Sequence, residues 1–312
     1  MPHPMIEPAL TLLTSNYIFP DKAATIAAAV RERDAAGDYD GLDEPTLGER
    51  VTALFDELSG DKHLRLRPTA NPGAETPAEA DIIAAWEAHL TRTNHGVAEV
   101  RRLPGNVGLI SLTNISSPES GSAVIAAAMT LVANTHALIF DNRQNRGGSP
   151  EGVQLWHSHL FPDGDTHLND IFTGGTGVTR QYWTLPAVPG PRYHDRPVWN
   201  LTSSTTFSAG EEFSYNLKTL KRATLVGETT RGGAHPTEVF PLSATFEITI
   251  PIARSINPVT GTNWEGTGVV PDIAVPADDA FGVAYKAALE HVIAGDPHPA
   301  TLAEAKEALA GL

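Results

Sequence analysis

From residue 106 onward the sequence alternates short apolar runs with amphipathic segments of helical length. Strands are expected over 108–113, 137–143, 198–201 and 223–227. Helices are expected between them, over 119–134, 152–160 and 209–220. A chain that returns by a helix after each strand builds a mostly parallel sheet with crossover helices. The pattern therefore predicts an α/β domain.

Residues 239–256 follow a different pattern. Their apolar positions alternate with polar ones and include Phe246, Ile248, Ile250 and Ile252. Alternation of this kind is typical of a β-hairpin with one buried face. We therefore expect a hairpin added to the sheet, followed by two helices in the tail from Asp278 onward.

The part of the chain before residue 106 combines helical patterns with a linker composition. Residues 1–66 are expected to be helical, and Gly60 is expected to end a helix there. Residues 67–80 have the Pro-rich composition of a linker, and another helix is expected over 78–94. We therefore predict a helical N-terminal domain at 1–66, a linker and helix at 67–105, and the α/β domain at 106–312.

A long segment inside the α/β domain has no clear period. Residues 162–196 carry several prolines and glycines. A connection of this length within a compact domain is usually functional or disordered. We interpret it as a lid or as a loop that faces a substrate.

Composition excludes several classes of function. The net charge of −15, without a local cluster of Lys and Arg, argues against nucleic-acid binding. The absence of cysteine excludes disulfides, thiolate catalysis and cysteine-bound zinc. There is no apolar run of about 18 residues, so we expect no membrane span. The N-terminus lacks the pattern of a signal peptide, so a cytoplasmic protein is expected, although a leader removed beforehand would leave the same sequence.

The stretch 197–213 contains the first candidate for chemistry. An apolar strand is followed by a turn rich in hydroxyl groups, and a helix is expected to begin at Ser208. Free backbone N–H groups and the positive end of the helix dipole lie at such a position. A serine nucleophile needs these groups, because its attack creates an oxyanion. A simple N-cap serine would give the same local pattern.

Three further segments carry polar groups in suggestive places. Gly147 and Gly148 follow an apolar strand, where paired glycines let backbone N–H groups approach a ligand. His63 lies just after an expected helix, and Glu265 lies in a turn next to glycine. A histidine can act as a general base, and a carboxylate can orient it. Nucleotide-binding glycine patterns are absent, and we expect neither a cofactor nor a metal.

These segments together resemble a known family. The stretches that carry the likeness are PGNVGLISL, IFDNRQNRGG, TSSTTFSAGEEF, RATLVGETTRGG and GTGVVPDI. In this order they are similar to the serine peptidases that comprise the C-terminal processing proteases, the catalytic core of tricorn protease and the modules of interphotoreceptor retinoid-binding protein. The resemblance implies a ClpP/crotonase-like fold for the α/β domain. It also implies hydrolysis of peptide bonds through an acyl-enzyme intermediate.

The resemblance assigns roles to individual residues. Ser208 matches the nucleophile, and the N–H groups of Gly148 and Ala209 match the oxyanion hole. Gly233 stands where bacterial processing proteases carry their catalytic lysine, so a Ser–Lys dyad is ruled out. The tricorn type instead uses a histidine and a glutamate. His63 matches that base, and Glu265 matches the orienting carboxylate.

The chain departs from the family in two places. Lys62 stands where the tricorn type has a relay serine before the histidine. Only about 40 residues separate His63 from Asn106, too few for a PDZ domain, so the likeness is greatest to the retinoid-binding modules. His235, near the lysine position of the family, is an alternative base. The active site is expected between the helical part and the α/β domain.

Alternatives to a peptidase remain open. One alternative is a protein of the same fold that has lost catalytic activity and binds a hydrophobic small molecule, such as a retinoid or a fatty acid. An esterase would use the same serine and oxyanion hole. The peptidase reading predicts a peptide or an unfolded protein as the substrate. The sequence does not indicate the oligomeric state.

Overall fold

The computed structural model describes residues 3–69, 79–295 and 297–312. The chain forms two compact units, and each is made from three separate pieces of sequence. Unit 1 comprises Met1–Ala84, Asp170–Arg180 and Gly233–Ile256. Unit 2 comprises Ala85–Asn169, Gln181–Gly232 and Asn257–Leu312.

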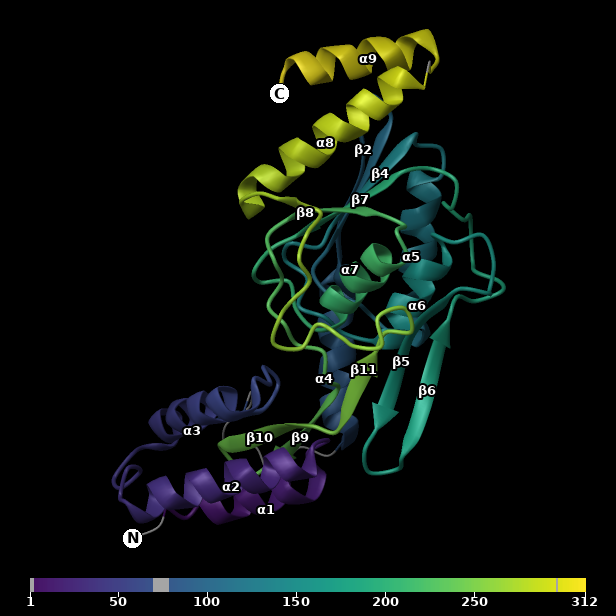
Figure 1. The fold of residues 1–312 in the computed structure, drawn as a ribbon. Coiled ribbons are helices and arrows are strands. Elements are labelled where there is room, and N and C mark those ends of the chain that lie inside the picture. Colours follow the sequence, from purple (N-terminus) through teal and green to yellow (C-terminus); the bar gives the residue numbers. More distant parts are fainter. Residues whose placement is uncertain (1–2, 70–78, 296) are drawn as a thin grey trace. The chain divides into compact units, whose positions relative to one another are not determined.

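Three helices open unit 1 (Figure 1): α1 (Ile6–Asn16), α2 (Pro20–Ala35) and α3 (Glu44–Ser59). The side chain of Asp43 caps α3 by accepting the Thr46 N–H at 2.9 Å. Gly60 ends α3 in the left-handed conformation, with φ of 72°. Glycine reaches that conformation without strain, so the predicted helix end at Gly60 is confirmed.

The three helices of unit 1 pack on an antiparallel sheet. Its strands are β1 (Arg65–Pro68), β9 (Thr237–Pro241) and β10 (Phe246–Pro251), in the order β1-β10-β9. The predicted hairpin is therefore confirmed as β9 and β10, but it belongs to this sheet and is not added to the mostly parallel sheet. Apolar side chains of β10 share one buried core with the helices, since Phe246, Ile248 and Ile250 lie against residues such as Leu13 and Phe55.

A second three-stranded sheet includes part of the predicted loop at 162–196. Strands β5 (His167–Thr173) and β6 (Val178–Trp183) join β11 (Ala253–Ile256) in the order β11-β5-β6. The expectation of an irregular segment is therefore wrong for these residues. The sequence pattern did not predict β6, because this strand is exposed at nearly every position and has no alternation of apolar and polar residues.

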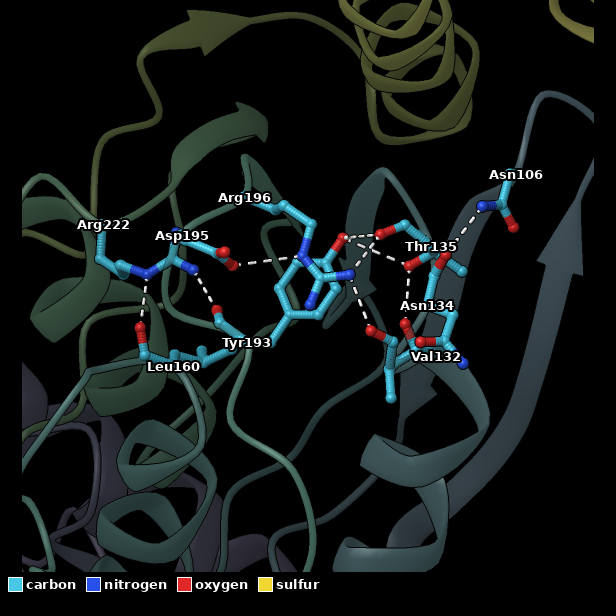
Figure 2. A network of polar contacts seen from close by, with 10 residues as sticks. Asn106, Val132, Asn134, Thr135, Leu160, Tyr193, Asp195, Arg196 and Arg222 are labelled. Atoms are coloured by element: carbon cyan, nitrogen blue, oxygen red, sulfur yellow. Dashed lines mark hydrogen bonds and ion pairs between the residues drawn. The ribbon is translucent and has the colours of Figure 1, made fainter. Parts of the chain in front are cut away.

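The end of the predicted loop, at residues 193–196, is bonded to the rest of unit 2 by hydrogen bonds between arginine side chains and backbone oxygens (Figure 2). Arg196 donates to the backbone oxygens of Ala133 and Thr135, both at 2.7 Å, and its guanidinium lies over the Tyr193 ring. Arg222 donates to the oxygen of Leu160 at 2.6 Å and to that of Tyr193. These contacts bond the end of the segment to unit 2, and its function as a lid or as a loop that faces a substrate stays a prediction.

Unit 2 is built on a six-stranded sheet. Its strands are β2 (Val97–Leu103), β3 (Val107–Leu112), β4 (Ala137–Asp141), β7 (Val198–Thr202), β8 (Thr224–Gly227) and β12 (Ile273–Ala274), in the order β12-β8-β7-β4-β3-β2. Only the β2–β3 pair is antiparallel among these neighbours. The predicted mostly parallel sheet is confirmed.

Helices cover both faces of this sheet (Figure 1). Helix α8 (Ala277–Ala294) packs on one face, where Ala284 and Ala288 share a core with Ile139 and Leu201, and α9 (Pro299–Ala310) packs on α8. The other face carries α5 (Pro118–Val132), α6 (Pro150–Ser158) and α7 (Ala209–Thr219). Phe140 points to this second face, against Trp156 and Phe213.

The two units differ from the three domains predicted in sequence order. The predicted boundaries at 66 and 105 separate the front of the chain from residues 233–256, whereas β10 pairs with β1. Helix α4 (Glu79–Arg92) and the short 3-10 helix η1 (Asn94–Gly96) follow the predicted linker. Residues 70–78 of that linker lie outside the described residues. In the described part of the chain, no helix combines the length and apolar character that a membrane crossing needs.

The packing of α3 in unit 1 leads to a stability prediction. A Cβ atom on Gly48 would lie 2.6 Å from Phe246 Cζ and 2.7 Å from the Leu66 oxygen. Gly48→Ala should therefore lower the free energy of unfolding by about 1–3 kcal/mol through overpacking. The matched control is Gly282→Ala in α8, where nothing lies within 4 Å, and it should raise stability by about 0.5–1 kcal/mol. Urea unfolding measures both, and equal stability of the two variants would contradict the packing.

Candidate active site

Ser208 lies between β7 and α7 in a strained backbone conformation. Its φ of 55° and ψ of −124° belong to a region that residues with a side chain rarely adopt. The chain leaves β7 at Thr202, turns through 203–207 and enters α7 at Ala209. In α/β-hydrolases a strained turn from strand to helix presents a serine hydroxyl above the sheet. Such strain persists only where surrounding contacts enforce it.

The carboxylate of Glu211 supplies one set of these contacts. It is completely buried and accepts the Ser208 N–H at 2.9 Å. It also accepts the Thr230 hydroxyl at 2.5 Å and the Gly232 N–H at 2.6 Å. Hydrogen bonds to an ionised carboxylate are among the stronger ones in proteins. Glu211 therefore fixes the backbone of Ser208 to the segment after β8.

Buried amide side chains supply the second set. Asn145 accepts the Phe207 N–H through its backbone oxygen at 3.0 Å, and its side chain donates to Asn142 at 2.7 Å. The Asn142 amide donates in turn to Asn200 at 2.6 Å. All three asparagines are completely buried. They join the loop after β4 to the turn that carries Ser208.

The paired glycines after β4 lie directly against this turn. Gly147 has φ of 105°, and a Cβ atom there would lie 2.7 Å from the Cβ of Ser208. Gly148 has φ of 141°, and a Cβ atom there would lie 2.0 Å from the Ile115 oxygen. Both positions therefore require glycine, because a side chain would be strained and would overlap its neighbours.

The glycine segment pairs with Ile115 through only two of its backbone groups. Ile115 donates its N–H to the oxygen of Gly147 at 2.8 Å, and its oxygen accepts the Ser149 N–H at 2.8 Å. The N–H of Gly148 points away from this pairing, since successive residues of an extended segment alternate. Within residues 3–69, 79–295 and 297–312, no hydrogen bond leaves the N–H of Gly148 or of Ala209. Neither N–H group therefore pairs with an acceptor among these residues.

The turn that carries Glu265 is tied to the same unit. Gly266 donates its N–H to the oxygen of Gly232 at 3.0 Å, and Gly232 donates in turn to Glu211. Val269 donates its N–H to the Thr230 hydroxyl at 2.7 Å. Unit 2 thus connects Ser208, Gly147 and the Glu265 turn through a short chain of hydrogen bonds.

His63 and His235 belong to unit 1, where Asp61 joins their segments. One oxygen of the Asp61 carboxylate accepts the His63 N–H at 3.1 Å. The other oxygen lies 2.7 Å from Nδ1 of His235 and accepts the Tyr17 hydroxyl at 3.1 Å. Burial alone would raise the pKa of Asp61, but the hydrogen bond from His235 and the charges of His235 and His63 hold that pKa below its usual value.

Lys62 has an ionic partner on α3. Its ammonium group lies 2.7 Å from one oxygen of Asp56 and 2.8 Å from the other. Lysine has three donors and no acceptor, so it cannot relay a proton as a serine does. The residue at the relay position is thus engaged with the neighbouring helix.

Sequence reasoning missed two groups of the site. Asp61 and Glu211 were not assigned a role at the site, although Asp61 lies two residues before His63 and Glu211 three after Ser208. Glu212 lies in the first turn of α7, where a negative charge would be favourable. Burial nevertheless raises the pKa of Glu212 to about 8, and the nearby Glu151 carboxylate adds to the rise. Glu212 is therefore protonated near neutral pH.

The neighbouring residues Glu211 and Glu212 form a matched pair for mutation. Glu211→Gln should lower the free energy of unfolding at pH 6 by about 1–3 kcal/mol, because an amide is a weaker acceptor for the buried donors. Glu212→Gln should change it by less than about 0.5 kcal/mol at pH 6, since the amide replaces a neutral carboxylic acid of the same shape. Urea unfolding compares them, and the reverse order would contradict the assigned charges.

The Glu212 carboxyl also predicts a pH dependence. A glutamate in the unfolded chain titrates near 4.5, whereas Glu212 in the folded protein titrates near 8. Between these values the folded state binds more protons, so stability falls as pH rises, by roughly 1.4 kcal/mol per pH unit. The contribution is complete below pH 4.5 and lost above about pH 8. Glu212→Gln should lack this slope, and parallel curves for the two proteins from pH 5 to 8 would refute the prediction.

Comparisons with known proteins agree with the geometry of unit 2. Residues 106–275, more than half of the chain, match the model of peptidase family S41. Over 199 residues the chain is 32% identical to carboxyl-terminal-processing peptidase 2, chloroplastic, of Arabidopsis thaliana. That alignment covers 60% of this chain and 37% of the relative, so the chain spans little more than a third of the relative's length.

Solved structures share the fold at low sequence identity. The photosystem II D1 C-terminal processing protease has a TM-score of 0.53 at 17% identity, covering 88% of this chain and 93% of that one. A lipoprotein from Streptococcus agalactiae has a TM-score of 0.58 at 16% identity, covering 92% and 96%. Tricorn protease has a TM-score of 0.54 at 14% identity, covering 92% and 36%. On the family match, the chain belongs to peptidase family S41.

Proposed function

We propose that this protein is a serine peptidase whose nucleophile is Ser208. The observation that carries the proposal is the strained backbone of Ser208 directly against Gly147, beside the N–H groups of Gly148 and Ala209, which pair with no acceptor in the described part of the chain. Membership of family S41 supports the same activity. Ser208 is the N-cap of α7, but N-cap residues typically have extended backbone angles, which Ser208 does not have.

The proposed reaction begins with attack of the Ser208 hydroxyl on a peptide carbonyl. His63 accepts the serine proton and then donates it to the leaving amine, and Glu265 orients the imidazole. The N–H groups of Gly148 and Ala209 hold the oxyanion, where loss of one donor typically lowers the rate by about 10²–10³. Water then attacks the acyl-enzyme. His63 accepts a proton from this water and donates it to the Ser208 oxygen, which releases the acyl group. The proposal requires the His63 imidazole to reach the Ser208 hydroxyl during the reaction.

The proposed substrate is a peptide or an unfolded protein. The relative from Arabidopsis is named as a carboxyl-terminal-processing peptidase, which supports a substrate of this class. The chain has Lys62 bonded to Asp56 where the tricorn type has a relay serine. We therefore propose that Glu265 acts on His63 without a serine between them, directly or through water.

The other candidate functions have less support. A binding module for a hydrophobic molecule would explain Lys62, but it gives no reason for the strain at Ser208. An esterase would use the same serine and donors, because the nucleophile does not determine the leaving group. Parallel assays with casein, an ester substrate and a lipophilic dye separate the three functions, since only an enzyme turns over its substrate.

Substitutions at Ser208 test the nucleophile and its strain together. Ser208→Ala should abolish labelling by a fluorophosphonate while leaving the melting temperature nearly unchanged, because alanine keeps the strained conformation. Ser208→Gly should also abolish labelling but raise the free energy of unfolding by about 1 kcal/mol, since glycine adopts positive φ without strain.

The control for both variants is Ser204→Ala, an exposed serine of the same turn, which should label like the parent protein. Labelling that persists in Ser208→Ala would remove Ser208 as the nucleophile. Equal stability of the glycine and alanine variants would remove the argument from strain.

A further inference from the structure

Unit 1 contains a buried cluster of polar groups that the proposed reaction does not use. Asp61 is 1% exposed, His235 5% and Tyr17 4%. The imidazole of His235 packs edge-on against the Phe19 ring, with 5.3 Å between ring centres. The hydrogen bond from His235 to Asp61 is therefore shielded from water by aromatic side chains. Shielded hydrogen bonds to a charge are stronger than exposed ones.

The protonation of this cluster follows from the donors around Asp61. The pKa of Asp61 lies below its usual value, so the carboxylate is ionised and only accepts. Nδ1 of His235 must then carry a hydrogen, because it lies 2.7 Å from an oxygen that cannot donate. Tyr17 donates to the same oxygen. The carboxylate is thus held in one orientation by two buried donors.

The other oxygen of the Asp61 carboxylate binds the turn that carries His63. It accepts the His63 N–H at 3.1 Å, and the His63 oxygen accepts the Thr249 hydroxyl at 2.5 Å. The turn lies between Gly60, where α3 ends, and Arg65, where β1 begins. Both backbone groups of His63 are therefore anchored, which fixes the point from which its side chain leaves the main chain.

We propose that His235 is a positioning residue that acts through Asp61 to hold the His63 turn for catalysis. The proposal rests on the role of His63 as the base in the proposed function. It assigns the orientation of His63 to contacts made at its backbone. This arrangement suits a chain in which lysine occupies the position of the relay serine, since the backbone anchor does not depend on that side chain.

The test compares two substitutions of His235 that differ in one donor. His235→Ala removes the hydrogen bond to Asp61 and should lower kcat for a peptide substrate by about tenfold to a hundredfold, with KM nearly unchanged. His235→Asn places an amide N–H near the position of Nδ1 and should keep kcat within about threefold of the parent protein. His291→Ala, an exposed histidine of α8, is the control and should keep full activity.

A second measurement tests the effect of His235 on the His63 turn without using catalytic activity. Hydrogen exchange at the His63 amide should be faster in His235→Ala than in the parent protein, because the accepting carboxylate is no longer held. His235→Asn should restore the slow exchange. Tyr17→Phe removes the other donor to the same oxygen and should give an intermediate rate.

Each outcome decides between positioning and the alternatives. Full kcat and slow His63 exchange in His235→Ala would overturn the proposal. Loss of activity in His235→Asn equal to that in His235→Ala, with slow exchange at His63, would also overturn it and would assign proton transfer to His235 itself. A parent protein that neither labels nor cleaves peptides would sink the proposed function instead, and the exchange rates would still decide the positioning role.

Discussion

The candidate site depends on one buried carboxylate, that of Glu211. Ser208 adopts a backbone conformation that is unfavourable for a residue with a side chain, and the hydrogen bond from its N–H to Glu211 helps to hold it there. The same carboxyl group binds Thr230 and Gly232, which themselves form hydrogen bonds with the turn of Glu265. One side chain thus connects three loops that are distant in the sequence, and the buried asparagines fix a fourth.

Local patterns in the sequence predicted most of unit 2. Its strands β3, β4, β7 and β8 are short apolar runs between helices, and their parallel pairing follows from that alternation. Unit 1 was harder to predict, because its sheet pairs residues 65–68 with residues 246–249, far apart in the chain. Strand β6 lacks a buried face at most positions, so no apolar period marked it.

Some residues of the candidate site could be proposed from the sequence, and others could not. Ser208 and the paired glycines could be found because a strand-to-helix turn and two adjacent glycines are local signals. The partners of Asp61 could not, since Tyr17 and His235 reach it from 44 and 174 residues away. The neutral state of Glu212 also depends on burial, which the helix position alone did not reveal.

The sheet of unit 1 has a consequence for synthesis of the chain on the ribosome. Helices α1, α2 and α3 are made first, but the strand that covers their apolar faces begins only at Phe246. At about 5–20 residues per second, the ribosome needs roughly ten to forty seconds to add the intervening residues. During that interval α1, α2 and α3 lack the strand that covers their apolar side chains. These side chains are then exposed to contact with other nascent chains.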